Sequence, residues 1–210
     1  DFQILQSDDH FRAVARSLTG DVLLTLKLMH RANRLNNSRP IKTEAVFGKL
    51  SSDQQREQSL SGLDFTLANG RKIYLRGKVD RIDQQDLEHI FGTIIDYKSN
   101  GKVFDFRDAY VGTELQLLTY WLALSKNSSR IGINQPGGAV FVQIRNKPAD
   151  ISQALAHQIQ LDQLIGDRAK QQVPDFQFHG ILLDDQNYLA NLQTISAGQK
   201  AKYYNFGLTR

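Results

Sequence analysis

Apolar residues recur at intervals of three and four in the first 40 residues of the chain. The positions are Leu18, Val22, Leu23, Leu26, Met29 and Ala32. This spacing predicts an amphipathic helix, with Asp21 in or near its first turn. The polar run 36–40, which ends in Pro40, ends that helix. The next stretch, 41–50, is compatible with a strand, and the Gln- and Ser-rich run 51–61 reads as a loop.

From Leu63 onward the apolar residues alternate with polar ones, which is the period of a half-buried strand. Asn69-Gly70 follows, and Asn-Gly between two such runs is a strong hairpin signal. A second strand is expected over 73–83, a turn over 84–86 and a third strand over 92–98. The pattern therefore predicts three consecutive antiparallel strands.

The second half of the chain alternates helical and extended patterns. A helix is expected over 106–125, because Val111, Leu115, Leu118 and Leu122 form one stripe. The further expectations are a turn-rich break over 127–138, an apolar strand over 139–144, a helix over 151–169, an extended segment over 176–183 and a helix or loop over 186–196. No repeat or interdomain linker is evident, so one α/β or α+β domain fits best.

The composition narrows the chemistry that the chain can perform. There is no cysteine among the 210 residues, which excludes disulfides, thiolate zinc sites, iron–sulfur clusters and thiol nucleophiles within them. Hard cations bound by oxygen ligands are the natural expectation for any metal site. The net charge of +4 permits attraction to a polyanion without establishing it.

The location of the protein can also be anticipated. The longest apolar run, 22–29, is interrupted by Thr25 and Lys27 and falls far short of the ~20 residues that a bilayer span requires. With no secretory leader visible, we expect a cytoplasmic protein that contacts no membrane. The chain begins at Asp1 and its only methionine is Met29, which suggests a piece of a larger protein.

Candidate chemistry is concentrated in residues 77–83 (GKVDRID) and 92–99 (GTIIDYKS). Asp96 and Lys98 are two residues apart on one strand and share a face, while Tyr97 points to the other face. If the hairpin is centred on Glu88, Asp80 lies directly opposite Asp96, with β-carbons about 5 Å apart. Two carboxylates at that separation repel each other unless a cation or a proton lies between them.

A divalent cation would resolve that repulsion. Asp80, Asp96 and the backbone carbonyl of Tyr97, completed by water, satisfy the octahedral oxygen demand of Mg²⁺. Lys98 beside it could orient or deprotonate a water, or neutralise charge on a phosphate. On this pattern alone, an ordinary ion pair at a strand end and a solvated turn edge explain the same residues equally well.

An Asp, a hairpin and an Asp-x-Lys at the end of a buried strand resemble the PD-(D/E)xK nuclease superfamily. Residues 77–83 and 95–99 look like the GxxDRID and DYKS motifs of its RecB-type branch. Gln116 and Tyr120 correspond to the QxxxY motif of that branch and, four residues apart, lie on one helical face. The resemblance implies that they bind or position the substrate; alone, they would be a helix surface with a partly buried tyrosine.

Further segments resemble the B subunits of AddAB and RexAB helicase–nucleases. Glu44, in 44–48 (EAVFG), is similar to their E-x-x-FG element, and 138–144 and 178–183 look like their downstream region. The similarity extends from about residue 21 to 183. It implies that Glu44 lies near the metal, whereas without the resemblance it is simply a carboxylate on a strand.

Two features of these relatives are missing from the chain. The upstream GxxxH helix is not found, because His10 and His30 lack the glycine context. The cysteines that hold an iron–sulfur cluster in the B subunits are absent, so no such cluster is expected within this chain.

The resemblance implies an α/β fold with a restriction-endonuclease-like core, a central mixed sheet flanked by helices. We expect one nuclease domain over 1–210, with a helical region over 1–40 and the active-site core over 41–145. Its expected activity is Mg²⁺- or Mn²⁺-dependent hydrolysis of DNA, as the nuclease module of a helicase–nuclease in double-strand break repair and recombination. Single-stranded DNA and an AddA/RexA-type subunit are the expected partners. Basic residues near the motifs could contact phosphates: Arg76, Lys78, Arg81, Lys102 and Arg107.

Two alternatives belong to other classes of protein. The first is a noncatalytic module that keeps the nuclease fold for DNA binding or subunit docking. The second is a metal-independent carbohydrate or small-molecule enzyme with paired carboxylates, which leaves Lys98 and the Gln116/Tyr120 pair unexplained.

Overall fold

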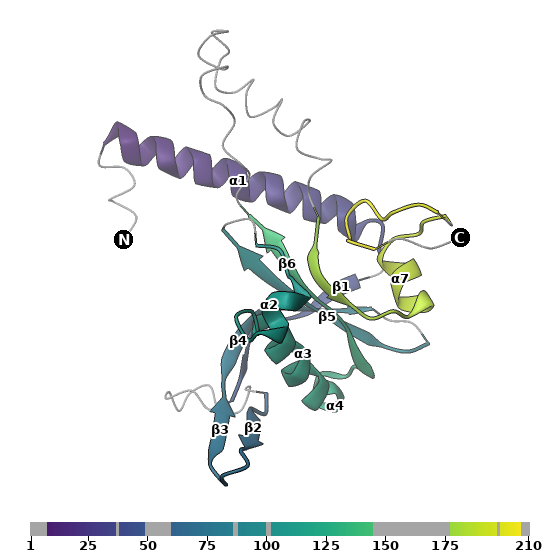
Figure 1. The fold of residues 1–210 in the computed structure, drawn as a ribbon. Coiled ribbons are helices and arrows are strands. Elements are labelled where there is room, and N and C mark those ends of the chain that lie inside the picture. The colour runs from purple at the N-terminus through teal and green to yellow at the C-terminus, as the bar shows by residue number, and fades with distance from the viewer. Residues whose placement is uncertain are drawn as a thin grey trace.

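The fold is built on one five-stranded sheet. The computed structural model describes residues 8–36, 38–48, 60–85, 88–99, 102–144, 177–196 and 198–206. Its main sheet has the order β1 (Ser38–Phe47), β4 (Gly77–Gln85), β5 (Phe91–Lys98), β6 (Gln135–Gln143) and β7 (His179–Leu182) (Figure 1). The β5–β6 pair is parallel and the other pairs are antiparallel, which confirms the predicted mixed sheet.

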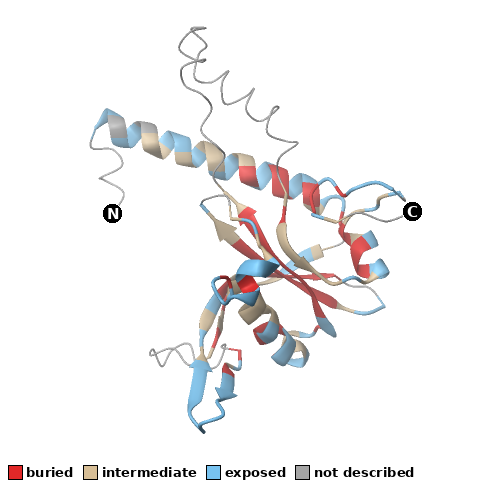
Figure 2. Ribbon diagram, viewed as in Figure 1, coloured by how far each residue is buried: buried red, intermediate tan, exposed pale blue. Residues whose placement is uncertain are grey.

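Helices cover both faces of this sheet. On one face, α1 (Asp9–Asn33) and α7 (Gln186–Leu192) pack against a core that contains Phe91, Ile95 and Val140. On the other face, α3 (Gln116–Lys126) packs against a second core. Burial is concentrated in the central strands and in the second half of α1 (Figure 2). Strands covered on both sides are apolar on both sides, as the sequence of β5 is until Asp96 apart from Thr93, whose hydroxyl is hydrogen-bonded to that of Tyr188.

The Asn69-Gly70 hairpin forms as predicted, but it belongs to a different sheet. Strands β2 (Leu63–Thr66) and β3 (Lys72–Leu75) pair only with each other among the described strands and extend away from the main sheet (Figure 1). The single strand expected over 73–83 is wrong, because the chain breaks at Arg76 and continues as β4 beside β1. β1 comes from a distant part of the sequence, so local alternation cannot reveal this pairing.

The helix predicted over 106–125 is two helices, α2 (Phe106–Tyr110) and α3. Gly112, between them, adopts a left-handed φ of 80° that interrupts the helical path. The expected stripe is also wrong: Val111 lies before α3, and Leu115 and Leu122 are exposed because α3 turns a different face to the core. The buried residues of α3 are Leu117, Ala123 and Leu124.

Several boundaries differ from the prediction; for example, β1 begins at Ser38 and β6 begins at Gln135. Helix α1 begins at Asp9, where the side chain of Asp8 accepts a hydrogen bond from the Phe11 N–H, so Asp21 lies in mid-helix. Strand β4 continues through the residues expected to turn at 84 and 85. A short helix, α4 (Ser128–Ile131), occupies part of the expected break. Apart from residue 60, which pairs with Phe47, and residue 61, the loop expected over 51–61 lies outside the described residues, as does the helix expected over 151–169.

Candidate active site

The end of the β4–β5 hairpin brings the two predicted aspartates together. The register pairs Arg81 with Ile95, and its next position places Asp80 across from Asp96, as the symmetry about Glu88 predicts. The Tyr97 backbone N–H donates a hydrogen bond of 2.9 Å to Oδ2 of Asp80. The Asp80 carboxylate is therefore fixed against the backbone of the neighbouring strand.

Asp96 lies at the centre of the site. Its side chain is only 3% exposed, because β5 is an inner strand flanked by β4 and β6. Its Oδ1 accepts a hydrogen bond of 2.9 Å from Nε2 of Gln116, and its Oδ2 lies 2.6 Å from Nζ of Lys98. The structure thus brings Asp96 together with the lysine of its own strand and with the glutamine of α3.

Gln116 and Tyr120 act as a pair on α3. Nε2 of Gln116 also donates to the Tyr120 hydroxyl at 3.0 Å, as expected for residues one helical turn apart. Burial raises the pKa of Tyr120, and the negative charges of Asp96 and Asp80 raise it further, although the Gln116 hydrogen bond opposes them. Tyr120 is therefore a neutral hydrogen-bonding group at physiological pH.

The charge on Asp96 is disfavoured by its surroundings. Burial raises the pKa of this carboxyl and the nearby charge of Asp80 adds to the effect, while Lys98 and then Lys102 oppose it. Its Oδ2 is almost completely buried and accepts no hydrogen bond of normal geometry from the described residues, so its partner is the ammonium of Lys98. A buried carboxylate oxygen of this kind is a suitable ligand for a hard cation.

The donor set at this site consists of two opposed carboxylates and nearby backbone oxygens. Within the parts of the chain that the structure describes, no group of three or more His, Cys, Asp or Glu side chains is arranged to hold a metal. Two carboxylates with backbone and water oxygens still suit Mg²⁺, which commonly binds through one or two carboxylates and keeps several waters. The residues present therefore fit a hard divalent cation.

Glu44 lies beside the site but turns its side chain elsewhere. It falls between the pairs Thr43–Arg81 and Ala45–Val79, and hence across from Asp80. Its carboxylate forms an ion pair with Lys78 at the exposed edge of the sheet. In this structure Glu44 therefore lies next to the candidate site, and its carboxylate is paired with Lys78.

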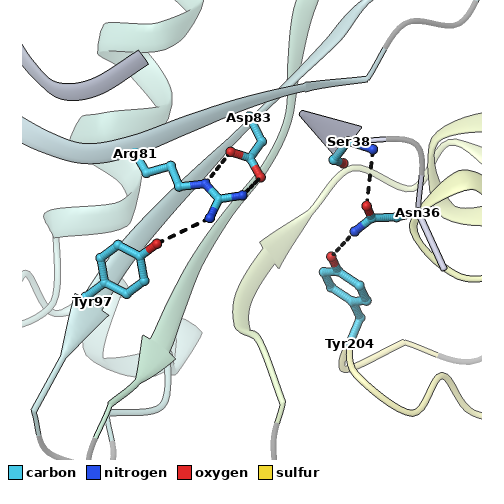
Figure 3. Close-up of polar contacts among 6 residues, drawn as sticks. All are labelled: Asn36, Ser38, Arg81, Asp83, Tyr97 and Tyr204. Atoms are coloured by element: carbon cyan, nitrogen blue, oxygen red, sulfur yellow. Dashed lines mark hydrogen bonds and ion pairs between the residues drawn. The ribbon is translucent and has the colours of Figure 1, made fainter. Parts of the chain in front are cut away.

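Arg81, a candidate phosphate contact, lies on the opposite face of the hairpin. Its guanidinium donates to both carboxylate oxygens of Asp83, at 2.5 and 2.6 Å, and lies 3.4 Å from the Tyr97 hydroxyl (Figure 3). Burial raises the pKa of the Asp83 carboxyl, and the Arg81 guanidinium opposes this shift. Strand alternation directs Arg81 away from Asp80, so it lies on the other face of the sheet from the candidate site.

Asn36 makes polar contacts that link the N-terminal and C-terminal parts of the domain. Asn36, just after α1, donates to the Tyr204 hydroxyl at 3.1 Å and accepts from the Ser38 N–H at 3.1 Å (Figure 3). This contact links α1, β1 and the C-terminal segment. It stabilises the fold on the face away from Asp96.

Two further charged residues lie near the site. Lys102 forms an ion pair with Glu114, and Oε1 of Glu114 accepts a hydrogen bond of 3.2 Å from the Gln116 N–H. Sequence reasoning did not single out Glu114, and it left Lys102 among five basic residues near the motifs. No sequence signal distinguishes them, because the contact depends on the fold of the segment between β5 and α3.

Sequence comparison places the chain in a known group. The family model described as the PD-(D/E)XK nuclease superfamily matches residues 3–195. The chain belongs to this superfamily. The matched range contains the aspartate pair, Lys98 and the Gln116/Tyr120 pair, so the residues that meet at the hairpin lie within the PD-(D/E)XK region.

Proteins named as the B subunit of an ATP-dependent helicase/deoxyribonuclease share this PD-(D/E)XK sequence. The one from Oenococcus oeni is 98% identical over 210 residues, covering all of this chain and 18% of that protein. Those from Leuconostoc citreum and Limosilactobacillus reuteri are 33% and 35% identical over 97% and 84% of this chain, and 16% and 13% of their own length. The chain therefore spans less than a fifth of these relatives.

Proposed function

We propose that this chain is the nuclease module of a longer helicase–nuclease subunit and hydrolyses DNA phosphodiester bonds. The observation that carries the proposal is the buried Asp96, opposed by Asp80 and joined to Lys98 and Gln116. In this proposal residues 1–210 form one domain. Residues 38–40 of the predicted helical region 1–40 belong to β1, and the active-site core over 41–145 follows. Membership of the PD-(D/E)XK superfamily supports it.

Asp80, Asp96 and the backbone carbonyl of Tyr97 would hold Mg²⁺ or Mn²⁺, with Glu44 as an additional candidate ligand. When bound, the ion supplies an activated water and offsets negative charge at phosphorus. Gln116 fixes the orientation of Asp96 through Oδ1, and Tyr120 fixes Gln116. Lys98 holds Oδ2 of Asp96 and places its ammonium where it neutralises charge on the phosphate.

The proposed substrate is single-stranded DNA. Phe106 and Tyr110 lie four residues apart on α2, on one helical face, with 67% and 92% of their surface exposed. The Glu114 N–H donates to the Asp108 carbonyl, so α2 is tied to the segment that leads into α3. Exposed aromatic rings stack on unpaired bases with little dependence on sequence, which suits a strand delivered by a motor.

The names of the relatives suggest the biological setting. They describe the B subunit of an ATP-dependent helicase/deoxyribonuclease. We therefore propose a helicase partner of AddA/RexA type and a role in double-strand break repair and recombination in the cytoplasm. Within the described residues, none of the helices has the length and apolar character needed to cross a membrane.

The test is cleavage of end-labelled linear DNA by the full-length subunit with its helicase partner. We expect degradation that requires Mg²⁺ or Mn²⁺, stops with a chelator and prefers single strands over blunt duplexes. Asp80→Asn, Asp96→Asn and Lys98→Met should each lower kcat by about 10²-fold or more, because charge stabilisation at the reacting centre is lost. Lys126→Met, at the far end of α3, is the control and should cleave normally.

One observation favours the noncatalytic alternative: both acidic groups beside Asp80 already have lysine partners, Asp96 with Lys98 and Glu44 with Lys78. A docking module predicts DNA binding that survives Asp80→Asn and Asp96→Asn and ignores chelators. Cleavage by these variants at the wild-type rate would refute the proposed centre, and absence of any cleavage with retained binding would favour the docking module.

A further inference from the structure

The basic residues near the motifs have different contacts in the structure. Arg81 is held by Asp83 on the far face of the sheet. Arg107 on α2 is almost fully exposed and pairs with Asp105, the N-cap residue of the same helix. Lys102 differs from both, because its ammonium lies near Phe141 and Glu114, which also contact residues of the candidate site.

The ring of Phe141 connects Lys102 with the candidate site. Phe141 is buried on β6 and is the register partner of Asp96. The Nζ atoms of Lys98 and Lys102 each lie 5.2 Å from the centroid of this ring. An ammonium within about 6 Å of an aromatic centroid is attracted to the ring. Phe141 therefore holds two ammonium groups beside the Asp96 carboxylate.

Glu114 fixes the ammonium of Lys102 in place. The Glu114 side chain is only 10% exposed, and one of its oxygens accepts the N–H of Gln116, the first residue of α3. The Lys102 side chain is 36% exposed, so a ligand in solvent can reach it. A lysine anchored by a buried carboxylate and still accessible is arranged to meet an anion from outside.

The two ammonium groups lie over the same ring, and each has one carboxylate partner, Asp96 for Lys98 and Glu114 for Lys102. An ammonium has three donor hydrogens, so each can also bind a further anion that approaches from solvent. A phosphodiester is such an anion, and lysine binds phosphate as a point charge. We propose that Lys102 is a second cationic contact for the DNA backbone: it binds a phosphate oxygen at or next to the linkage that Asp96 and Lys98 address, with Glu114 as its positioning residue. This inference rests on the proposed nuclease function and names the substrate contact of the same site.

The test measures kcat and KM separately for a single-stranded oligonucleotide, using the full-length subunit with its helicase partner. Lys102→Ala should raise KM by about 10-fold or more, because a hydrogen bond to a charged group is lost, and kcat should change far less. The slope of log(kcat/KM) against log salt should become shallower by about 0.7, the value for one phosphate contact on a single strand. The metal concentration for half-maximal rate should not move, and Lys102→Arg should restore most of the affinity.

Glu114→Gln tests the positioning role, because glutamine can still accept the Gln116 N–H but cannot form the ion pair. It should raise KM in the same direction as Lys102→Ala, and the double variant should be no worse than Lys102→Ala alone, since coupled residues are not additive. A fall in KM for Glu114→Gln would show that Glu114 only weakens DNA binding, and would overturn its assigned role.

Lys126→Ala is the matched control. Lys126 is a comparably exposed lysine that also pairs with an acidic residue, Asp64, but lies at the far end of α3, so KM and salt slope should stay at wild-type values. A Lys102→Ala variant with wild-type KM and salt slope, or with only a lower melting temperature, would overturn this inference while the Asp96→Asn result still supports the nuclease. Wild-type cleavage by Asp96→Asn would instead refute the proposed function.

Discussion

Glu44 carries unusual backbone geometry next to the candidate site. Its φ is 53°, and it is the sole non-glycine residue with a positive φ in the described part of the chain. A left-handed conformation costs an ordinary residue roughly 1–2 kcal/mol, because Cβ approaches the following carbonyl. Strain of this kind is tolerated where it serves a site, and Glu44 lies across from Asp80. This strained position therefore adjoins the candidate site, where Glu44 is proposed as an additional ligand.

Glycine at position 44 should relieve the strain. Glu44→Gly and Glu44→Gln both lose the ion pair with Lys78, but only glycine adopts φ of 53° without penalty. We expect Glu44→Gly to be more stable than Glu44→Gln by up to about 1 kcal/mol in urea unfolding. Both variants should need more Mg²⁺ for cleavage than the wild type. Equal stability of the two variants would show that the backbone is unstrained.

Two glycines, one on a helix and one on a strand, have opposite effects on the stability of the fold. Gly20 lies inside α1, and a Cβ added there meets nothing within 4 Å. Gly180 lies on β7, where a Cβ would be 2.1 Å from the carbonyl oxygen of Ala139 on the paired strand. The first glycine weakens its helix through backbone entropy, whereas the second permits β6 and β7 to approach.

Alanine at these two positions should therefore have opposite effects. Gly20→Ala should stabilise the domain by roughly 0.5–1 kcal/mol, the difference in helix propensity. Gly180→Ala should destabilise it by about 1–3 kcal/mol or more, because the strands must move apart. Urea unfolding of the two variants measures both effects. A neutral Gly180→Ala would mean that the β6–β7 pair adjusts freely.

In the whole molecule, the sheet separates two hydrophobic cores that have different roles. Leu28 of α1 is buried on the face away from Asp96, while Leu117 is buried on α3, directly after Gln116. Stability depends on both cores. The position of the Gln116 amide depends on the α3 side alone.

Truncation of these two leucines should separate stability from catalysis. Leu28→Ala and Leu117→Ala should each cost about 2–5 kcal/mol, as cavities in well-packed cores do. Hydrogen exchange of the β5 amides reports the loss in each variant. Among the molecules that stay folded, only Leu117→Ala should lower kcat, since it loosens the helix that orients Asp96. Equal kinetic effects would show that the two faces are mechanically coupled.

Local sequence patterns were enough to predict how the reacting groups are arranged along the backbone. Alternation on β5 puts Asp96 and Lys98 on one face, and hairpin symmetry puts Asp80 opposite Asp96. Helical spacing places Gln116 and Tyr120 together. These features were predictable because strand and helix periods are local properties of the chain.

Which elements pack together, and where the long side chains end, is visible only in the folded molecule. β1 joins β4 in place of the β2–β3 hairpin, Gly112 divides the predicted helix, and Glu44 turns to Lys78. The link from Lys102 through Glu114 to the start of α3 likewise appears only after folding. Strand partners distant in sequence and the rotamers of charged side chains depend on burial and charge summed over the whole fold, which no local period encodes.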